Sequence, residues 1–166
     1  MSNGLSNMVS PTKQIVLNII DFTTSKTIIN LSPSGRRCDF VKLNPDCIRD
    51  ILLAVEDKSS YGKLIFSDEL FKSTFLSSYS EKEVLYHTHQ LAWSKLLEQT
   101  DFYLDNSFSV LDLSPQGHEF LNNIRSNDNW NKTKEFSNKA GSLAISTLQS
   151  VASSIISASI QKYLGF

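Results

Sequence analysis

Residues 80–117, SEKEVLYHTHQLAWSKLLEQTDFYLDNSFSVLDLSPQG, decide the fold of this chain. The stretch opens with a capping box, in which the Ser80 hydroxyl accepts from the amide of Glu83 and the Glu83 carboxylate reaches back to the amide of Ser80. The helix that begins there is predicted to run to about Gln99. Its apolar stripe is predicted from five residues, Leu85, Thr88, Ala92, Leu96 and Leu97.

Two strand-like segments follow this helix, 102–104 and 107–113, and the second alternates apolar and polar residues. Asp105-Asn106 lies between them and is typical of a tight turn, so the two segments predict a β-hairpin. Ser114 then caps another helix, with Pro115 in its first position.

On the N-terminal side, residues 44–57 predict a helix, because Asn44 can cap it and Pro45 suits its first turn. Its apolar face is formed by Ile48, Ile51, Leu52 and Val55, which recur at spacings of three and four. A short strand is predicted at 64–66, followed by a helical turn or an extended piece at 68–76. The order of helix, long capped helix, hairpin and helix indicates a winged helix, with the long helix for recognition and the Asp105-Asn106 turn at the wing tip.

Toward the C-terminus, a polar stretch from Arg125 to Asn131 is predicted to interrupt the helices, and a last helix covers about 134–164 with a break near Gly141. The 22 residues from Ala140 to Gln161 carry no charge and include seven serines. Surface-binding membrane helices carry Lys or Arg on their polar face, so this composition argues against membrane binding. We expect instead a helix that either packs back on its own chain or joins two copies, and the candidate oligomerisation stripe is formed by Ile145, Leu148, Ala152, Ile155, Ile156 and Ile160.

The overall expectation is an α+β, mainly helical chain in three parts. Residues 1–41 form an N-terminal extension, 42–125 the winged-helix-like domain, and 126–166 an amphipathic helical tail. Two short strands are predicted at 14–22 and 26–31, so the extension is expected to be an accessory hairpin or disordered, unless it is the product of an upstream translation start. The chain begins without a basic segment followed by an apolar core, which predicts a cytoplasmic protein.

Composition and motifs argue against an enzyme. The 166 residues include 16 basic and 17 acidic side chains, for a net charge of −1. No glycine-rich phosphate loop or pair of carboxylates at catalytic spacing occurs. On a helix, His87 and His89 point in very different directions, which disfavours a shared metal ion. Cys47 has no evident base, so it is predicted to be a small buried residue rather than a nucleophile. We therefore expect no catalytic site, no metal and no cofactor.

From residue 42 onward the chain resembles a bacterial and phage family, the domain of unknown function 2513. The motifs that carry the resemblance are KLNPD at 42–46, IRDILL at 48–53, YSEKEVLYH at 79–87, LSPQGHEFLNNIR at 113–125, and then Trp130 and Lys132. The resemblance covers about residues 42–166. It implies a small winged-helix protein of the kind encoded near phages and other mobile elements, without an established activity.

Two functions from different classes follow from this reading. The leading one is a DNA-binding regulator that works as a homodimer on double-stranded DNA. Its candidate contacts are Lys82, His87, His89, Gln90, Lys95, Asn106, Arg125, Lys132 and Lys134. Glu83 lies one turn before His87 and is expected to bond to it and raise its pKa. The alternative is a protein-binding adaptor that modulates a host or defence component, since the acidic long helix would repel DNA phosphates. A membrane-active effector is a third, minor reading.

Overall fold

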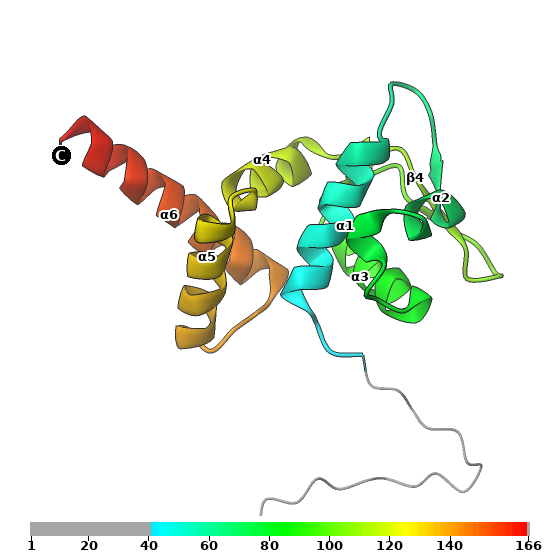
Figure 1. Cartoon of the computed structure of the whole chain (residues 1–166), viewed down its shortest axis with the longest axis horizontal. Helices are drawn as coiled ribbons and strands as arrows, with labels where there is room; N and C mark the ends of the chain where they lie inside the picture. The colour runs from blue at the N-terminus through cyan, green and yellow to red at the C-terminus, as the bar shows by residue number, and fades with distance from the viewer. Residues whose placement is uncertain (1–40, 166) are drawn as a thin grey trace, which may run out of the picture. The chain divides into compact units, whose positions relative to one another are not determined.

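The computed structural model describes residues 41–165, and Figure 1 shows the order of their helices and strands. The elements are α1 (Pro45–Lys58), β1 (Ile65–Phe66), α2 (Ser67–Phe71), the 3-10 helix η1 (Thr74–Leu76), α3 (Glu81–Trp93), β2 (Leu97–Glu98), β3 (Asp101–Phe102), β4 (Phe108–Val110), β5 (Asp112–Leu113), α4 (Pro115–Ile124), α5 (Asn127–Lys139) and α6 (Ile145–Leu164). The prediction of a mainly helical α+β chain is confirmed. The predicted strands within residues 1–41, and with them the N-terminal β extension, lie outside the described residues.

Helix α1 begins and packs as its sequence predicts. The Asn44 side-chain oxygen accepts from the amides of Asp46 at 3.1 Å and Cys47 at 3.5 Å, and Pro45 occupies the first turn. The apolar face is buried, and it comprises Cys47, Ile48, Ile51, Leu52, Ala54 and Val55. This face packs against α3, η1 and α4, so α1 is the central helix of the core (Figure 1).

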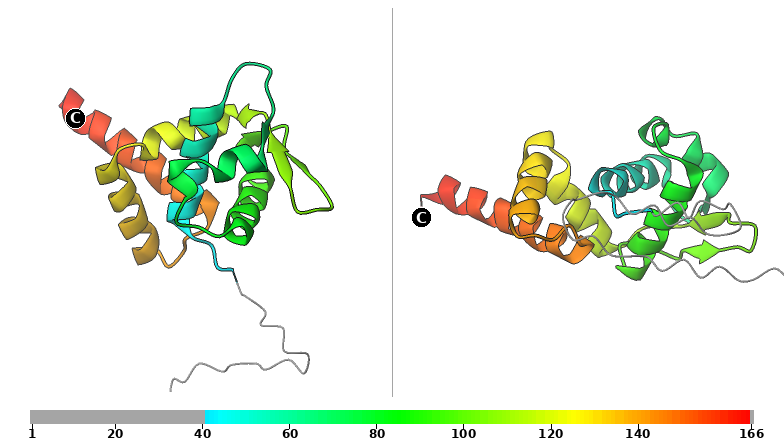
Figure 2. Two further views of the ribbon diagram at one scale, coloured as in Figure 1. Left: turned by 45° about the vertical axis from the view of Figure 1, so that its right-hand side comes forward. Right: turned by 90° about the horizontal axis from the view of Figure 1, so that it is seen from below.

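The strands form two small antiparallel sheets. The larger has the order β1-β4-β3, with Ile65 opposite Val110 and Phe102 opposite Phe108. The predicted hairpin is thus present, and Figure 2 shows its turn projecting away from the helices. The segment 107–113 was predicted as one strand, but it supplies β4 to this sheet and β5 to a separate pair with β2.

Helix α3 begins at the predicted cap but ends six residues earlier than predicted, at Trp93 instead of Gln99. Lys95 adopts a left-handed backbone with φ of 57°, and the amide of Leu96 donates to the carbonyl of Leu91 at 3.0 Å. Such a turn ends a helix because its residues leave the helical hydrogen-bonding pattern. The chain is then free to form β2, which pairs with β5.

The buried stripe of α3 also differs from the predicted one. Val84, His87, Thr88 and Leu91 are buried, at spacings of three and four, whereas Leu85 and Ala92 are only partly buried. His87 therefore belongs to the core side of the helix.

Helix α5 lies where the sequence predicted an interruption. Ser126 caps it by accepting from the amide of Asn129 at 3.1 Å, so most of the polar stretch from Arg125 to Asn131 is helical. Trp130, within that stretch, is buried. It supplies an apolar contact that a largely polar sequence does not suggest. The predicted break near Gly141 is present, between α5 and α6, and Gly141 has a φ of 75°.

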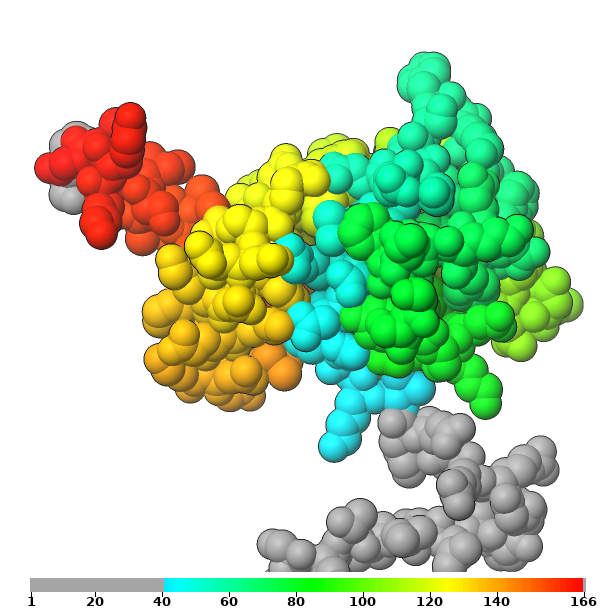
Figure 3. Space-filling view, in the orientation of Figure 1, coloured from blue at the N-terminus to red at the C-terminus, as the bar shows by residue number. Residues whose placement is uncertain are grey.

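Helices α4, α5 and α6 pack on one another, and the fully buried residues of α6 all lie in its first half. Ile145, Leu148 and Ala152 are buried within the chain. This part of the helix therefore packs back on its own chain, one of the two expected arrangements, and these three residues are not free to join two copies. Ile155 and Ile156 are partly buried and Ile160 is 54% exposed. Figures 1 and 3 show the C-terminal half of α6 extending beyond α4 and α5. Among the described residues, no helix combines the length and the apolar character needed to cross a membrane.

Candidate functional site

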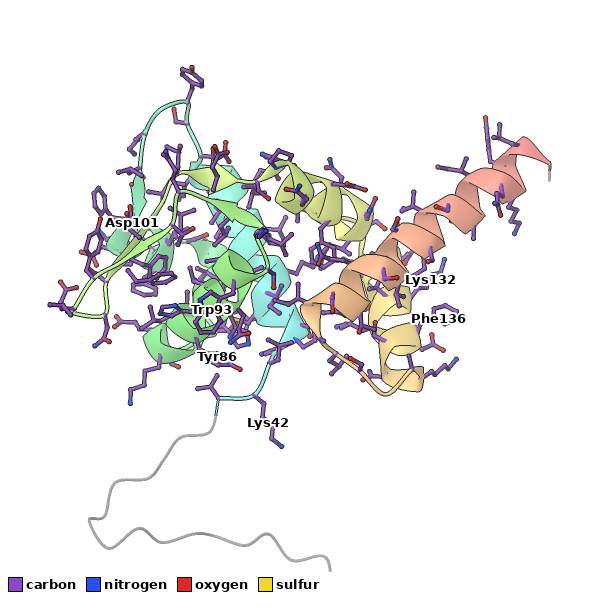
Figure 4. The ribbon with its side chains drawn as sticks, turned by 180° about the vertical axis from the view of Figure 1, so that it is seen from behind. Lys42, Tyr86, Trp93, Asp101, Lys132 and Phe136 are labelled. Carbon is purple, nitrogen blue, oxygen red and sulfur yellow. The ribbon has the colours of Figure 1, made fainter. Side chains whose placement is uncertain are left out.

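The solvent side of α3 gathers the polar and aromatic residues that the core does not use. Tyr86, His89, Gln90 and Trp93 lie at spacings of three and four, on the side of the helix away from the buried stripe. Figure 4 shows Tyr86 and Trp93 on this helix. Together with Phe102 of β3, these four residues are called the α3 face below.

An aromatic stack joins α3 to the hairpin. The rings of His89 and Phe102 lie 3.6 Å apart between centroids and only 12° from parallel. The ring of Trp93 lies 5.5 Å from that of His89, and the Trp93 side chain remains 71% exposed. The Trp93 indole therefore lies near the His89–Phe102 stack and remains largely exposed.

A groove of about 520 Å³ lies between α3 and the start of α6. Tyr86 and Gln90 line it from α3, Ile145 and Gln149 line it from α6, and Leu43 lines it from the segment before α1. Helix α3 thus carries an exposed indole, which can anchor a partner, and one wall of a groove, which can receive it.

Helix α3 and the hairpin carry a net negative charge. Between residues 80 and 113 there are six acidic side chains and two basic ones, Lys82 and Lys95. Both lysines are exposed, as are Asp101 and Asp105 on and beside the hairpin. The α3 face is therefore aromatic and its surroundings are negative.

His87 is not available to DNA, which corrects the sequence prediction. Its side chain is 0% exposed, and its Nε2 accepts from the backbone amide of Asn44 at 2.7 Å. Its Nδ1 donates to the backbone carbonyl of Glu83 at 2.7 Å, instead of bonding to the carboxylate. Burial lowers the pKa of His87, where we had expected the neighbouring Glu83 to raise it.

The other predicted DNA contacts are divided between separate surfaces. Arg125 is held by the Glu56 carboxylate at 2.7 and 2.8 Å, and Lys134 lies 2.7 Å from the Asp46 carboxylate. Lys132 is exposed on α5, well away from α3 in Figure 4. Asn106 is exposed in the hairpin turn with a φ of 65°. Lys82, His89, Gln90 and Lys95 alone remain on or beside α3.

Cys47, Glu83 and His87 bring a thiol, a carboxylate and an imidazole within 4.8 Å of one another where α1 meets α3. Burial, with the nearby charges of Glu83 and Asp50, raises the pKa of the Cys47 thiol to about 12, so the thiol stays protonated. Both ring nitrogens of His87 and the Glu83 carboxylate already have hydrogen-bond partners. The cluster therefore fits a joint between two helices better than a metal site or a reactive thiol.

Trp93 and Phe102 were not singled out from the sequence as site residues. A signal was present, because Trp93 lies four residues after His89 and seven after Tyr86, on one side of the helix. Phe102, whose ring stacks on His89, belongs to β3, and β3 is positioned by pairing with β4. The contact between His89 and Phe102 is therefore not local in sequence.

The comparisons with known proteins identify a family without a described activity. A family model described as "Hypothetical protein (DUF2513)" matches residues 42–143, from the segment before α1 to the break after α5. An uncharacterised protein of Haemophilus influenzae strain Rd is 32% identical over 120 residues, which cover 70% of this chain and 97% of that protein. No solved structure matches the chain. The resemblance seen in the sequence motifs is thus confirmed, and this chain belongs to the DUF2513 family.

Proposed function

We propose that this chain is a non-enzymatic winged-helix protein of phage or mobile-element type, acting in the cytoplasm as an adaptor that binds a protein partner through the α3 face. The order α1, β1, α2, α3 and the antiparallel arrangement β1-β4-β3 support the winged-helix assignment. In this assignment α3 is the recognition helix and the turn at 103–107 is the wing. Because a fold does not fix a function, the partner is inferred from the chemistry of the face.

The observation that carries the proposal is Trp93, which is 71% exposed and lies 5.5 Å from the His89 ring between centroids. It shares α3 with Tyr86 and Gln90, which line the groove. Tryptophan and tyrosine are enriched among the few residues that dominate protein–protein binding energies. The acidic surroundings, including Asp101, favour a partner segment that combines an apolar side chain with Lys or Arg.

DNA binding is the less well supported candidate. Phosphate contacts by basic side chains supply much of the affinity for DNA, and the α3 region offers Lys82 and Lys95 against six acidic groups. The start of α6 also forms one wall of the groove beside α3. A recognition helix has to enter a major groove about 12 Å wide, so such a neighbour restricts its approach.

Replacing Trp93 with alanine tests the proposal. Removing the central anchor of an interface costs about 2 kcal/mol or more, which corresponds to about a 30-fold rise in Kd. The full chain serves as bait in quantitative affinity capture from the native host, and the Kd of the recovered protein is then measured with both purified components. We expect the Trp93→Ala variant to lose the partner that the wild-type chain retains.

Phe136→Ala is the matched control, because Phe136 is also an exposed aromatic residue, 51% accessible, but lies on α5. It is expected to bind like the wild type. Equal binding by the Trp93→Ala variant would contradict the proposal. So would tight, strongly salt-dependent binding of labelled duplex DNA in fluorescence anisotropy that is lost in the Lys82→Glu/Lys95→Glu double variant, since that result would identify a DNA-binding regulator.

A second part of the proposal is self-association through the free half of α6. Ile156, Ile160 and Leu164 form one stripe at spacings of four, and the last two are 54% and 61% exposed. The Ser154, Ser157 and Ser159 hydroxyls donate to carbonyls of their own helix at 2.8–3.0 Å. These donors are therefore satisfied without hydrogen-bond acceptors from a neighbouring helix. Lys162 is the single charged side chain of this helix. A second copy of the helix therefore fits the stripe better than a highly charged partner does.

Ile160→Glu is expected to give a monomer in sedimentation equilibrium at concentrations at which the wild-type chain associates. The introduced carboxylate would have to be buried without a partner, which is strongly unfavourable. Lys162→Glu is the control, because this residue is exposed on the same part of α6 but off the apolar stripe. A wild-type chain that remains monomeric at high concentration would contradict this part of the proposal.

A further inference from the structure

Asn44 makes hydrogen bonds to two helices, α1 and α3, through three of its groups. Its side-chain oxygen caps α1, its side-chain nitrogen donates to the Glu83 carboxylate at 3.0 Å, and its backbone amide donates to Nε2 of His87 at 2.7 Å. Glu83 and His87 both belong to α3. The hydrogen bonds that join the segment before α1 to α3 are therefore made by Asn44.

The hydrogen bonds of His87 define its tautomer. Nε2 faces an amide donor, so it has to be the acceptor, and Nδ1 faces the Glu83 carbonyl, so it has to carry the proton. Because the ring is fully buried, water cannot replace either partner. This arrangement is possible for a neutral imidazole and impossible for an imidazolium ion.

We propose that His87 and the segment Lys42–Asn44 form a proton-operated latch, which is closed when the ring is neutral and released when the ring takes up a proton. In the charged ring, Nε2 becomes a donor and meets the Asn44 amide donor, so the two groups have to separate. Proton uptake breaks the Asn44 bond, while the Lys42 backbone carbonyl, like the Glu83 carboxylate, favours the charged ring.

The groups around the ring agree with this behaviour. From α3, the Glu83 carboxylate favours the charged form, and from α1 the Cys47 thiol is neutral because its pKa is raised to about 12. Burial is the larger effect, and it lowers the pKa of His87 below its ordinary value of 6.5 in the closed state. Opening exposes the ring and restores that value, so acid favours opening between the two pKa values.

Release of the latch reaches the α3 face. Leu43 lies between the two residues that contact the ring, and it forms one wall of the groove beside Tyr86 and Ile145. Movement of Lys42–Asn44 therefore removes a wall of the groove. It also separates Asn44 from α3, and this effect goes beyond the proposed binding function.

The test is amide hydrogen exchange of the full chain, followed by NMR between pH 7.5 and pH 5 in about half-unit steps, together with the ring nitrogen shifts of His87. We expect the protection factor of the Asn44 amide to fall by up to about tenfold per pH unit below about 6.5, until the closed-state pKa is reached. Protection of the core amides of Leu121 and Leu148 is expected to stay constant over the same range.

His87→Gln supplies the matched variant, because an amide oxygen can accept from Asn44 but does not titrate; His118→Gln, on α4, is the control histidine. The pH dependence at Asn44 should disappear in the first variant and persist in the second. The latch is overturned if wild-type Asn44 protection stays constant while the ring shifts report protonation. It is also overturned if Asn44, Leu121 and Leu148 lose protection together, and neither outcome depends on the folding of a variant.

Discussion

Replacing Trp130 with alanine is expected to lower the free energy of unfolding by about 3–5 kcal/mol, the range for deleting a large buried aromatic side chain. Trp130 is 2% exposed, and its indole nitrogen donates to the Asp46 carboxylate at 2.7 Å. The ammonium group of Lys134 lies 5.5 Å from the ring centroid and bonds to the same carboxylate. The substitution therefore removes the packing of α5 and one of the bonds that hold it to α1.

The electrostatics of this contact point in the same direction. Burial alone would raise the pKa of Asp46, but the hydrogen bonds from Lys134 and Trp130 outweigh it and lower the pKa. A carboxylate with a lowered pKa stabilises the folded state above its unfolded pKa, and this contribution is lost as the pH falls through the folded value. The destabilisation caused by Trp130→Ala is thus expected to be larger at pH 7 than at pH 3.

Urea unfolding followed by circular dichroism measures the change, and the second tryptophan supplies the control. Trp93 is 71% exposed, so Trp93→Ala is expected to change stability by less than about 1 kcal/mol. Trp130→Phe keeps most of the packing but loses the indole donor, and an intermediate loss is expected. Similar losses for the two tryptophan-to-alanine variants would contradict the packing described for α5.

The sequence predicts those parts of the fold that depend on local signals. Asn44 and Pro45 mark the start of α1, Ser80 marks α3 and Ser114 marks α4, because each cap bonds to amides within the next three residues. The Asp105-Asn106 turn predicts the hairpin for the same reason. These features need no knowledge of distant residues.

The parts that were wrong depend on distant partners. Nothing near Lys95 indicates that α3 ends there, since the end is stabilised by pairing of β2 with β5, about 15 residues away. The polar stretch at 125–131 becomes helical because Trp130 finds Asp46 on α1. From the sequence alone a polar stretch is assigned to a loop, because the distant partner of its single large apolar residue is not known.

The candidate site shows the same division. His87 was taken for a surface residue, although its spacing from Val84 and Leu91 places it on one helical side with them. A helical wheel centred on those two residues would have found it. The stack of His89 on Phe102 joins a helix to a strand, so it follows only from the tertiary fold.

Gly117→Ala is expected to destabilise the chain by about 2–4 kcal/mol, although glycine to alanine within a helix ordinarily stabilises a protein by about 0.5–1 kcal/mol. Gly117 lies in the first turn of α4, where a β-carbon would collide with the backbone carbonyl oxygen of Leu96. That oxygen is fixed in place, because it accepts from the amide of Ser114 at 3.0 Å. The Ser114 hydroxyl also donates to the Lys95 carbonyl at 2.6 Å and accepts from the Gly117 amide at 3.0 Å.

The clash therefore falls on backbone that cannot move without breaking the cap of α4 and the end of α3. Gly141→Ala is the matched control, because Gly141 has a φ of 75° but has open space around it. Backbone strain alone should cost that variant about 1 kcal/mol. If Gly117→Ala is neutral or stabilising in urea unfolding, α4 can slide away from the Leu96 carbonyl. A loss clearly greater than that of Gly141→Ala shows instead that the glycine in the SPQG motif is required for the close contact between α4 and the turn after α3.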